Sequence, residues 1–200
     1  MKMKFFLVKL LLLLASPRVF CRSLMKIWTL LLALGLPLLL LAAASPTPPT
    51  VIYLVRHGEK DLTPGVADPL LTTAGEARAQ ALADRLARER PTALFTTDTR
   101  RTRATLAPLA QAAHLTPLVY SAKEPAALVQ RINQEYAGQT VVVVGHSNTL
   151  LPLLAALGVH EAVPEIGDDE YSNLYKVTLR DGKPAKVEVS HYGKHIEAKL

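Results

Sequence analysis

Two histidines in this chain of 200 residues each follow a short apolar run. His57 comes after residues 51–55 and Arg56, and His146 comes after the valine run 141–144 and one glycine. A neutral imidazole can attack an electrophile, and a protonated imidazole is a cation. Apolar runs of this length are typical of buried strands, and ligands of open α/β sheets bind at the carboxyl ends of such strands. We therefore expect both histidines to face one ligand.

Arginine side chains stand where an anion could bind beside these histidines. Arg56 directly precedes His57, and Arg101 lies in residues 97–105, which are rich in arginine and threonine. Guanidinium groups form paired hydrogen bonds with phosphate oxygens. Transfer of a phosphoryl group needs a nucleophile, positive charge at the phosphate oxygens and a proton for the leaving group. His57 suits the first role, and the two arginines with a protonated His146 suit the second.

The helix expected after His146 adds two candidate substrate-binding residues. Ser147 and Asn148 stand at its start, where backbone N–H groups and the helix dipole attract anions. Arginine and histidine supply the positive charge that this chemistry requires, and the sequence around the histidines has no clustered carboxylates to hold an ion. The sequence therefore predicts no metal and no cofactor.

Strands and helices alternate along the chain from residue 51 onward. After the first strand, the expected strands are 93–95, 118–120 and 140–145, and the expected helices run from Thr73 to Pro91 and over 100–113, 125–136 and 148–157. Two alternating stretches, 174–179 and 185–192, flank Asp181-Gly182, which is typical of a hairpin turn. This pattern predicts a three-layer α/β fold, with a mostly parallel sheet flanked by helices and a C-terminal β-hairpin.

Four short motifs, in order, resemble those of the histidine phosphatase superfamily, also called the phosphoglycerate mutase-like family. Residues 56–59 match the family's R-H-G-E pattern, and residues 71–75 match its Leu-Thr-x-x-Gly stretch. Residues 97–105 match Ser-x-x-x-Arg-x-x-x-Thr, with Thr97 in place of serine and Arg101 as the key arginine, and Gly145-His146 matches the second histidine. The resemblance implies that residues 51–200 form a histidine phosphatase domain, in which His57 forms a phosphohistidine.

The proton donor to the leaving group has two candidates. In much of the family an acidic residue after the third strand has this role, and Glu124 stands there. In the acid phosphatase and phytase branch the acid follows the second histidine, but Ser147 occupies that position. Asp168, Asp169 and Glu170 lie in a long loop that could fold over the site. We rank Glu124 first and this loop second.

All of the net charge of +6 lies in the first 44 residues, which contain six of the 23 basic residues and none of the 17 acidic ones. The formally neutral remainder argues against nucleic acid as a partner. Basic residues up to Lys26, an apolar run from Ile27 and three alanines at 42–44 are typical of a secretory signal peptide, and an uncleaved membrane anchor is the alternative. Met25 is a candidate natural start, and residues 45–50 form a proline-rich linker.

The same segment contains the only cysteine, Cys21, so residues 45–200 have neither a thiol nucleophile nor a cysteine metal site. We expect an exported enzyme, periplasmic or secreted, or one anchored to a membrane with its domain outside the cytoplasm. The expected activity is metal-independent hydrolysis of a small phosphomonoester, either a metabolite or an envelope component. The short stretch between residues 120 and 140 leaves little room for the cap insertion of mutases, which favours hydrolysis.

Two other functions fit the same residues. One is a phosphohistidine protein phosphatase, and the other is a non-catalytic module that binds a phosphate ligand. For the leading function, phosphomonoester hydrolysis, the expected partner is a small-molecule phosphomonoester. A membrane is expected as a partner only through an uncleaved N-terminal segment.

Overall fold

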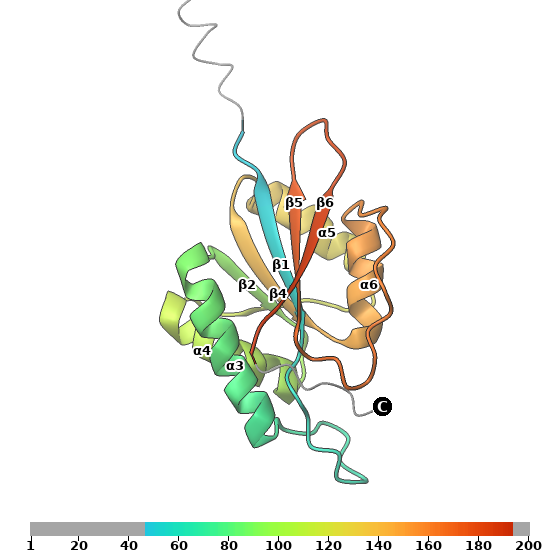
Figure 1. The fold of residues 1–200 in the computed structure, drawn as a ribbon. Helices are drawn as coiled ribbons and strands as arrows, with labels where there is room; N and C mark the ends of the chain where they lie inside the picture. Colours follow the sequence, from blue (N-terminus) through green and yellow to red (C-terminus); the bar gives the residue numbers. More distant parts are fainter. Residues whose placement is uncertain (1–46, 194–200) are drawn as a thin grey trace, which may run out of the picture. The chain divides into compact units, whose positions relative to one another are not determined.

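The computed structural model of the chain describes residues 47–193. The predicted signal peptide or anchor and the first two residues of the linker lie outside the described residues. A six-stranded sheet forms the centre of the domain, in the order β3-β2-β4-β1-β5-β6 (Figure 1). The strands are β1 Thr50–Arg56, β2 Ala93–Thr96, β3 Leu118–Val119, β4 Thr140–Gly145, β5 Asn173–Leu179 and β6 Lys186–His191.

Strand directions confirm the predicted sheet. Strand β4 pairs in parallel with both β1 and β2, and β2 pairs in parallel with β3. Strand β5 runs antiparallel to β1 and forms a hairpin with β6 at the C-terminal edge. The sheet is therefore mostly parallel, with the antiparallel hairpin that the Asp181-Gly182 turn indicates.

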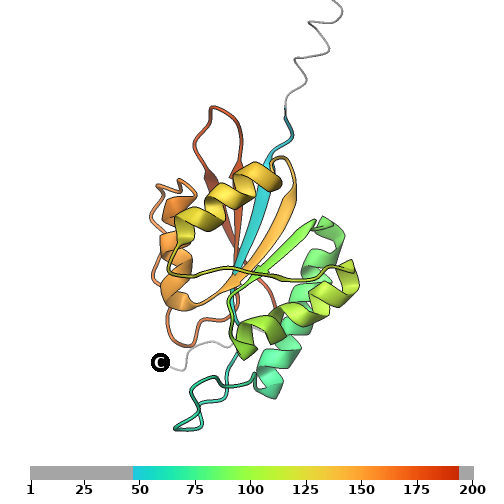
Figure 2. The same cartoon turned by 180° about the vertical axis from the view of Figure 1, so that it is seen from behind.

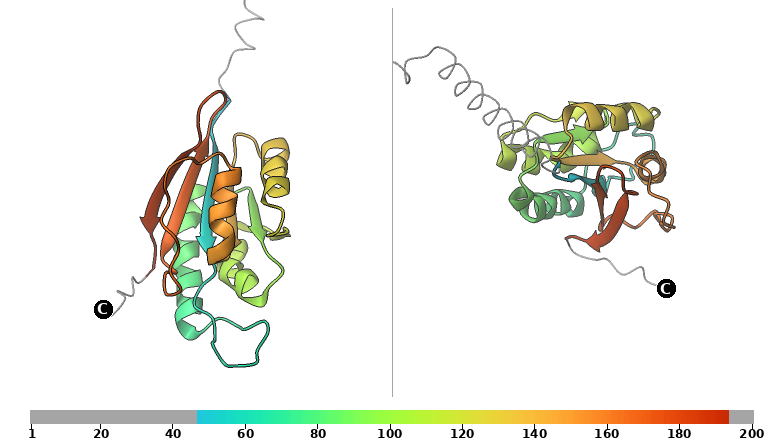
Figure 3. Two further views of the ribbon diagram at one scale, coloured as in Figure 1. Left: turned by 90° about the vertical axis from the view of Figure 1, so that its right-hand side faces the viewer. Right: turned by 90° about the horizontal axis from the view of Figure 1, so that it is seen from above.

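Helices cover both faces of this sheet and make the two outer layers of a three-layer fold (Figures 2 and 3). Side chains alternate between the faces along each strand, so Tyr53 and Val55 pack with α3 and α4 while Ile52 and Leu54 pack with α5 and α6. The helices are α3 Thr73–Leu86, α4 Arg100–Ala113, α5 Pro125–Glu135 and α6 Ser147–Ala156, and a short 3-10 turn, η1 Ala87–Glu89, follows α3.

Threonine hydroxyls cap the N-termini of α3 and α4. The Thr72 side chain accepts a hydrogen bond from the Gly75 N–H at 3.2 Å, and the Thr99 side chain accepts one from the Thr102 N–H at 3.5 Å. Such caps satisfy backbone donors that have no partner within a helix. Helix α6 begins at Ser147, one residue earlier than expected from the sequence.

Pairing of β1 with β4 brings the two predicted histidines together. The register sets Arg56 opposite Gly145, and the His57 N–H donates to the Gly145 carbonyl at 3.0 Å. Because the strands are parallel neighbours, the residues that follow them lie side by side at one sheet edge. No helix within residues 47–193 has the length and apolar character needed to cross a membrane.

Candidate active site

The His57 ring is buried at the carboxyl end of β1, with 3% of the residue exposed. Its Nδ1 atom lies 2.7 Å from the Gly58 carbonyl oxygen. A carbonyl only accepts hydrogen bonds, so Nδ1 carries the proton in the neutral ring and Nε2 keeps its lone pair. His57 therefore offers Nε2 as a nucleophile.

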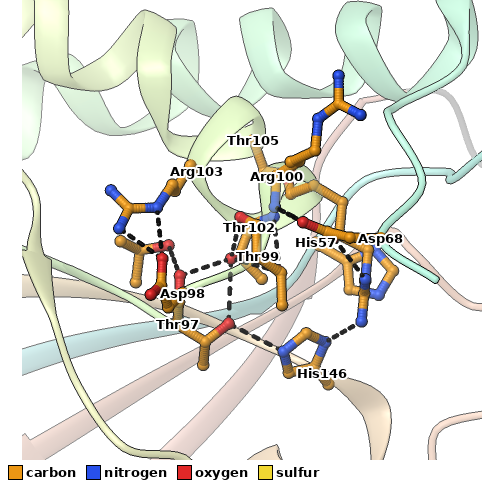
Figure 4. Close-up of polar contacts among 12 residues, drawn as sticks. His57, Asp68, Thr97, Asp98, Thr99, Arg100, Thr102, Arg103, Thr105 and His146 are labelled. Carbon is orange, nitrogen blue, oxygen red and sulfur yellow. Dashed lines mark hydrogen bonds and ion pairs between the residues drawn. The ribbon is translucent and has the colours of Figure 1, made fainter.

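The His146 ring lies beside that of His57, with 5.3 Å between the ring centroids and an edge-on geometry. Its Nε2 atom lies 2.9 Å from the Thr97 hydroxyl, and its Nδ1 atom lies 3.4 Å from Nη2 of Arg101. Figure 4 shows Thr97 and His146 joined in this way, with the His57 ring nearby. The arrangement places two imidazoles and one guanidinium around a common point.

The surroundings of both rings favour the neutral form. Burial, together with the positive charges of Arg101 and Arg56, lowers the pKa of His57 to about 4. Burial and the charges of Arg101, Arg56 and Lys60 lower the pKa of His146 to about 4, although Asp68 opposes this shift. A neutral His57 suits a nucleophile. In these surroundings His146 is neutral at pH 7. It therefore does not supply the third positive charge that a protonated ring would add.

Arg56 is a buried residue, with 5% of it exposed, and its guanidinium is held by the loop that precedes β5. Its Nη1 atom donates to the backbone carbonyls of Gly167, Asp168 and Glu170 at 2.8, 2.9 and 3.2 Å. The Tyr171 ring lies against the same guanidinium, 4.1 Å from its central carbon to the ring centroid. A cation over an aromatic face is favourable, so this loop orients Arg56 from two sides.

Arg101, in the first turn of α4, pairs with an acidic residue that sequence reasoning missed. Its Nη1 atom lies 3.3 Å from Oδ1 of Asp68, whose carboxylate also accepts from the Arg100 N–H at 3.0 and 3.2 Å. Asp68 belongs to the loop between β1 and α3. Among the described residues, Asp68 is the carboxylate that forms an ion pair with Arg101.

Two buried guanidinium nitrogens have no hydrogen-bond partner among the described residues. They are Nε of Arg56 and Nε of Arg101. Buried donors are nearly always paired in folded proteins, because an unpaired one costs about 1–3 kcal/mol. Both atoms are cationic donors on the two arginines that flank the histidines. An oxyanion with several acceptor oxygens is the ligand that this pair fits.

Close backbone packing holds the end of β1 against the start of α3. A side chain at Gly58 would lie 2.8 Å from the Gly75 carbonyl oxygen, and one at Gly75 would collide with the Glu59 backbone. Both positions therefore require the absence of a Cβ atom. The Thr72 N–H donates to the Glu59 carbonyl at 2.9 Å across the same contact. The Leu-Thr-x-x-Gly stretch thus acts on the position of His57 through the backbone.

The Thr105 hydroxyl joins α4 to the same strand end. It accepts from the Gly58 N–H at 2.8 Å and donates to the Arg101 carbonyl at 2.8 Å. The spacing of four between Arg101 and Thr105 places both on one side of α4. The arginine and the strand that carries the nucleophile are therefore fixed relative to each other.

Comparison with known proteins decides the family. The model of the histidine phosphatase superfamily (branch 1) matches residues 52–123. The domain belongs to the histidine phosphatase superfamily. The family resemblance is thereby confirmed; the matched residues include three of the four sequence motifs, and Gly145-His146 lies outside them. No curated protein matches the chain at a significant level.

Solved structures of two phosphatases and a phosphoglycerate mutase share the fold. A mycobacterial glucosyl-3-phosphoglycerate phosphatase is 16% identical, with a TM-score of 0.58 over 72% of this chain and 98% of its own. The protein histidine phosphatase SixA, complexed with tungstate, is 19% identical, with a TM-score of 0.59 over 70% and 96%. A phosphoglycerate mutase from Bacillus anthracis is 16% identical, with a TM-score of 0.59 over 72% and 94%. At these identities the likeness establishes the fold.

The histidine phosphatase domain brings together four of the residues expected from its sequence. Arg56, His57, Arg101 and His146 all lie at the carboxyl ends of β1 and β4 and the start of α4. Ser147 and Asn148 are the first two residues of α6, where Ser147 is half-buried and Asn148 is exposed. Their assignment to substrate stays a prediction.

The two candidates for the proton donor are in different surroundings. Glu124 is exposed at the N-terminus of α5, and none of the recorded hydrogen bonds or ion pairs of residues 47–193 joins its carboxylate to either histidine. The loop with Asp168, Asp169 and Glu170 does reach the site, but through its backbone carbonyls on Arg56. The Glu170 carboxylate accepts from the Gly167 N–H at 3.1 Å within its own loop. The role of either candidate stays a prediction.

Sequence reasoning missed Asp68, Tyr171 and the role of Thr97. Asp68 stands in a loop without regular structure, and Tyr171 stands more than a hundred residues from Arg56 along the chain. Neither has a periodicity that marks it. Thr97 was recognised only as part of a family motif. Its place directly after β2 is the feature from which a contact with His146 could have been predicted.

Proposed function

We propose that this protein is a phosphomonoester hydrolase that acts through a phosphohistidine on His57. The observation that carries the proposal is the pair of unpartnered guanidinium nitrogens on Arg56 and Arg101, beside a neutral imidazole with a free Nε2 lone pair. Phosphoryl transfer depends on positioning and on stabilising negative charge at the equatorial oxygens. The two arginines supply that charge from within the fold, so no metal is required.

The reaction has two steps. In the first, Nε2 of His57 attacks phosphorus, the ester P–O bond breaks, and the leaving oxygen takes a proton from the general acid. In the second, water attacks the same phosphorus and gives a proton to the conjugate base of that acid, the P–N bond breaks, and inorganic phosphate leaves. The hydrogen bond from Nδ1 to the Gly58 carbonyl stabilises the positive charge that the ring acquires when it is phosphorylated. His57 is regenerated as a neutral imidazole.

The short connection between β3 and β4 favours hydrolysis over mutase chemistry. Between β3 and β4 the chain forms one helix, α5, of 11 residues. A mutase needs further structure over the site to retain a phosphorylated intermediate. We infer from the short connection that the phosphoenzyme is open to water.

The test of the function is hydrolysis of p-nitrophenyl phosphate, followed by a panel of natural phosphomonoesters. His57→Ala is expected to lose several orders of magnitude in kcat, while its far-UV circular dichroism stays that of the wild type. His160→Ala, at an exposed histidine outside the site, is the matched control and should keep full activity. Turnover by His57→Ala near that of the control would overturn the proposal.

A leaving-group comparison identifies the proton donor. p-Nitrophenol leaves without a proton, whereas an alkyl alcohol needs one. If Glu124 is the donor, Glu124→Gln will lose activity towards an alkyl phosphate and keep it towards p-nitrophenyl phosphate. Asp68→Asn is the parallel variant, because Asp68 is the carboxylate in contact with Arg101. A uniform loss on both substrates would assign the residue to phosphate binding instead.

Phosphohistidine protein phosphatase activity is the second candidate, and the same short connection between β3 and β4 favours it, because little covers the site from that side. SixA, with the same fold, is a protein histidine phosphatase. A histidine-phosphorylated protein domain, assayed beside sugar phosphates at matched concentration, separates the two. A preference for the protein of 100-fold in kcat/KM would favour this second function. A pure binding module would bind inorganic phosphate and turn over neither substrate.

The proposed setting is outside the cytoplasm, in the periplasm or the medium. The N-terminal charge pattern and the apolar run support it. In that setting, small phosphorylated metabolites and envelope components are the available phosphomonoesters. The membrane would be a partner only through an N-terminal segment that stays uncleaved.

A further inference from the structure

Thr97 is a buried hydroxyl that touches a site histidine and does not face solvent. It follows β2 directly, and 5% of the residue is exposed. Its Oγ1 atom lies 2.9 Å from Nε2 of His146 and 3.0 Å from the Thr102 hydroxyl. Both contacts are shown in Figure 4. Thr97 is therefore placed to act on His146 from the side away from Arg101.

The direction of these hydrogen bonds follows from Arg101. A guanidinium group only donates, so Nδ1 of His146, 3.4 Å from Nη2 of Arg101, must accept. The neutral ring then carries its proton on Nε2 and donates it to the Thr97 hydroxyl. The Thr97 hydroxyl in turn has its own proton to donate to Thr102.

The series ends at backbone carbonyls, which fixes its polarity. The Thr102 hydroxyl donates to the carbonyl of Thr97 or of Thr99, each at 3.0 Å. Because a carbonyl cannot donate, the series has one consistent order, from His146 through Thr97 and Thr102 to the backbone. Thr102 itself is fully buried, so water does not compete for these bonds.

We propose that Thr97 is a positioning residue, which holds His146 in the Nε2-protonated tautomer with Nδ1 directed towards Arg101 and the phosphate site. The inference rests on the proposed function for its kinetic consequence. With this tautomer, Nδ1 keeps its lone pair. When a phosphate dianion binds and replaces the hydrogen bond from Arg101, Nδ1 takes up a proton from water, and the resulting cation adds to the two arginines. Without the Thr97 acceptor, the other tautomer turns an N–H towards Arg101 and loses this role.

The test compares Thr97→Val with Thr97→Ser. Valine keeps the shape of threonine and removes the hydroxyl, whereas serine keeps the hydroxyl. Loss of a residue that orients a metal-binding imidazole costs about 10- to 100-fold in activity. By the same orienting role we expect Thr97→Val to lose about 10-fold in kcat, with a smaller change in KM. Thr97→Ser should recover activity to within about threefold of wild type.

Thr96→Val is the matched control. Thr96 is the preceding residue, is fully buried, and its hydroxyl donates to the Thr97 carbonyl and not to a histidine. This variant removes an equally buried hydroxyl at the same strand end and should leave kcat and its pH profile unchanged. A loss in kcat equal to that of Thr97→Val would show that any buried hydroxyl here has the same effect, and would overturn the proposal.

A spectroscopic readout separates positioning from stability. The ¹⁵N chemical shifts of His146 report which ring nitrogen carries the proton. We expect Nε2–H in the wild type and in Thr97→Ser, and a mixture of tautomers in Thr97→Val. Nδ1–H in the wild type would overturn the proposal. If the wild type hydrolyses no phosphate ester, the proposed function fails, while the tautomer measurement still decides the role of Thr97.

Discussion

Acidification from pH 7 to pH 5 should destabilise the fold through His57. The pKa of the buried ring is lowered to about 4, whereas an unfolded histidine has a pKa of about 6.5. The unfolded chain therefore binds this proton first. The stability that the neutral buried ring contributes is complete above about pH 6.5, is lost as pH falls towards about 4, and changes no further below that.

The magnitude follows from the distance between the two pKa values. Each pH unit between them is worth 1.36 kcal/mol, and about 1.5 units lie between pH 6.5 and pH 5, so His57 accounts for about 2 kcal/mol of lost stability. His146 has a similarly lowered pKa but is only half-buried, so solvent screening makes its share smaller. A loss of 2 kcal/mol is a large part of the stability of a typical domain.

Urea unfolding at pH 7, 6 and 5, followed by circular dichroism, measures this loss. His57→Gln removes the titrating group, so the free energy of unfolding of the variant should fall by about 2 kcal/mol less than that of the wild type over this range. His160→Gln removes an exposed histidine and should behave as the wild type. If the wild type and His57→Gln lose the same stability between pH 7 and pH 5, the assignment of a neutral, buried His57 is wrong.

Three further predictions concern metal, the buried ion pair and processing. Hydrolysis should survive EDTA, because the charge at the phosphate oxygens comes from Arg56 and Arg101; loss of activity that one added metal restores would contradict this. Glu59→Gln should lower the free energy of unfolding by about 3 kcal/mol, because Arg78 is buried against that carboxylate at 2.7 Å; exposed Glu76→Gln is the control, and equal losses would refute the argument. N-terminal sequencing of the protein from a fractionated host should find a start near Ser45 outside the cytoplasm; an intact N-terminus in the membrane pellet would indicate an anchor, and one in the cytosol would exclude both.

The sequence was enough to predict that His57 and His146 lie at the carboxyl ends of strands. The valine run before His146 and the apolar run before His57 are local patterns, and the rule that ligands bind at the carboxyl ends of parallel strands joins them. The order of strands was not predictable in this way. That β4 and β1 are neighbours depends on packing across the whole sheet, and it is this pairing that sets the two rings 5.3 Å apart.

Contacts made by backbone carbonyls left no pattern in the residue types. Arg56 is held by carbonyls from residues 167–170, and any residue provides a carbonyl. The prediction that this loop folds over the site relied on its acidic side chains, whereas the structure uses its main chain. Asp68 was missed for a related reason, since an aspartate in a polar loop has the same appearance whether it is solvated or paired.

The two ends of β1 give the domain a polarity that matters for any form of tethering. The chain enters at Thr47, and the Gly138 N–H donates to the Thr50 hydroxyl at 2.8 Å where the strand starts. Seven residues of strand, about 23 Å at the rise of an extended chain, then separate this entrance from His57. A protein immobilised on a bead or a bilayer by residues before 47 would therefore hold His57 at the end of β1 that is away from the attachment point. Attachment after Tyr192, whose carbonyl accepts from the buried Arg78 at 3.1 Å, would instead place the support next to the end of the domain that does the chemistry.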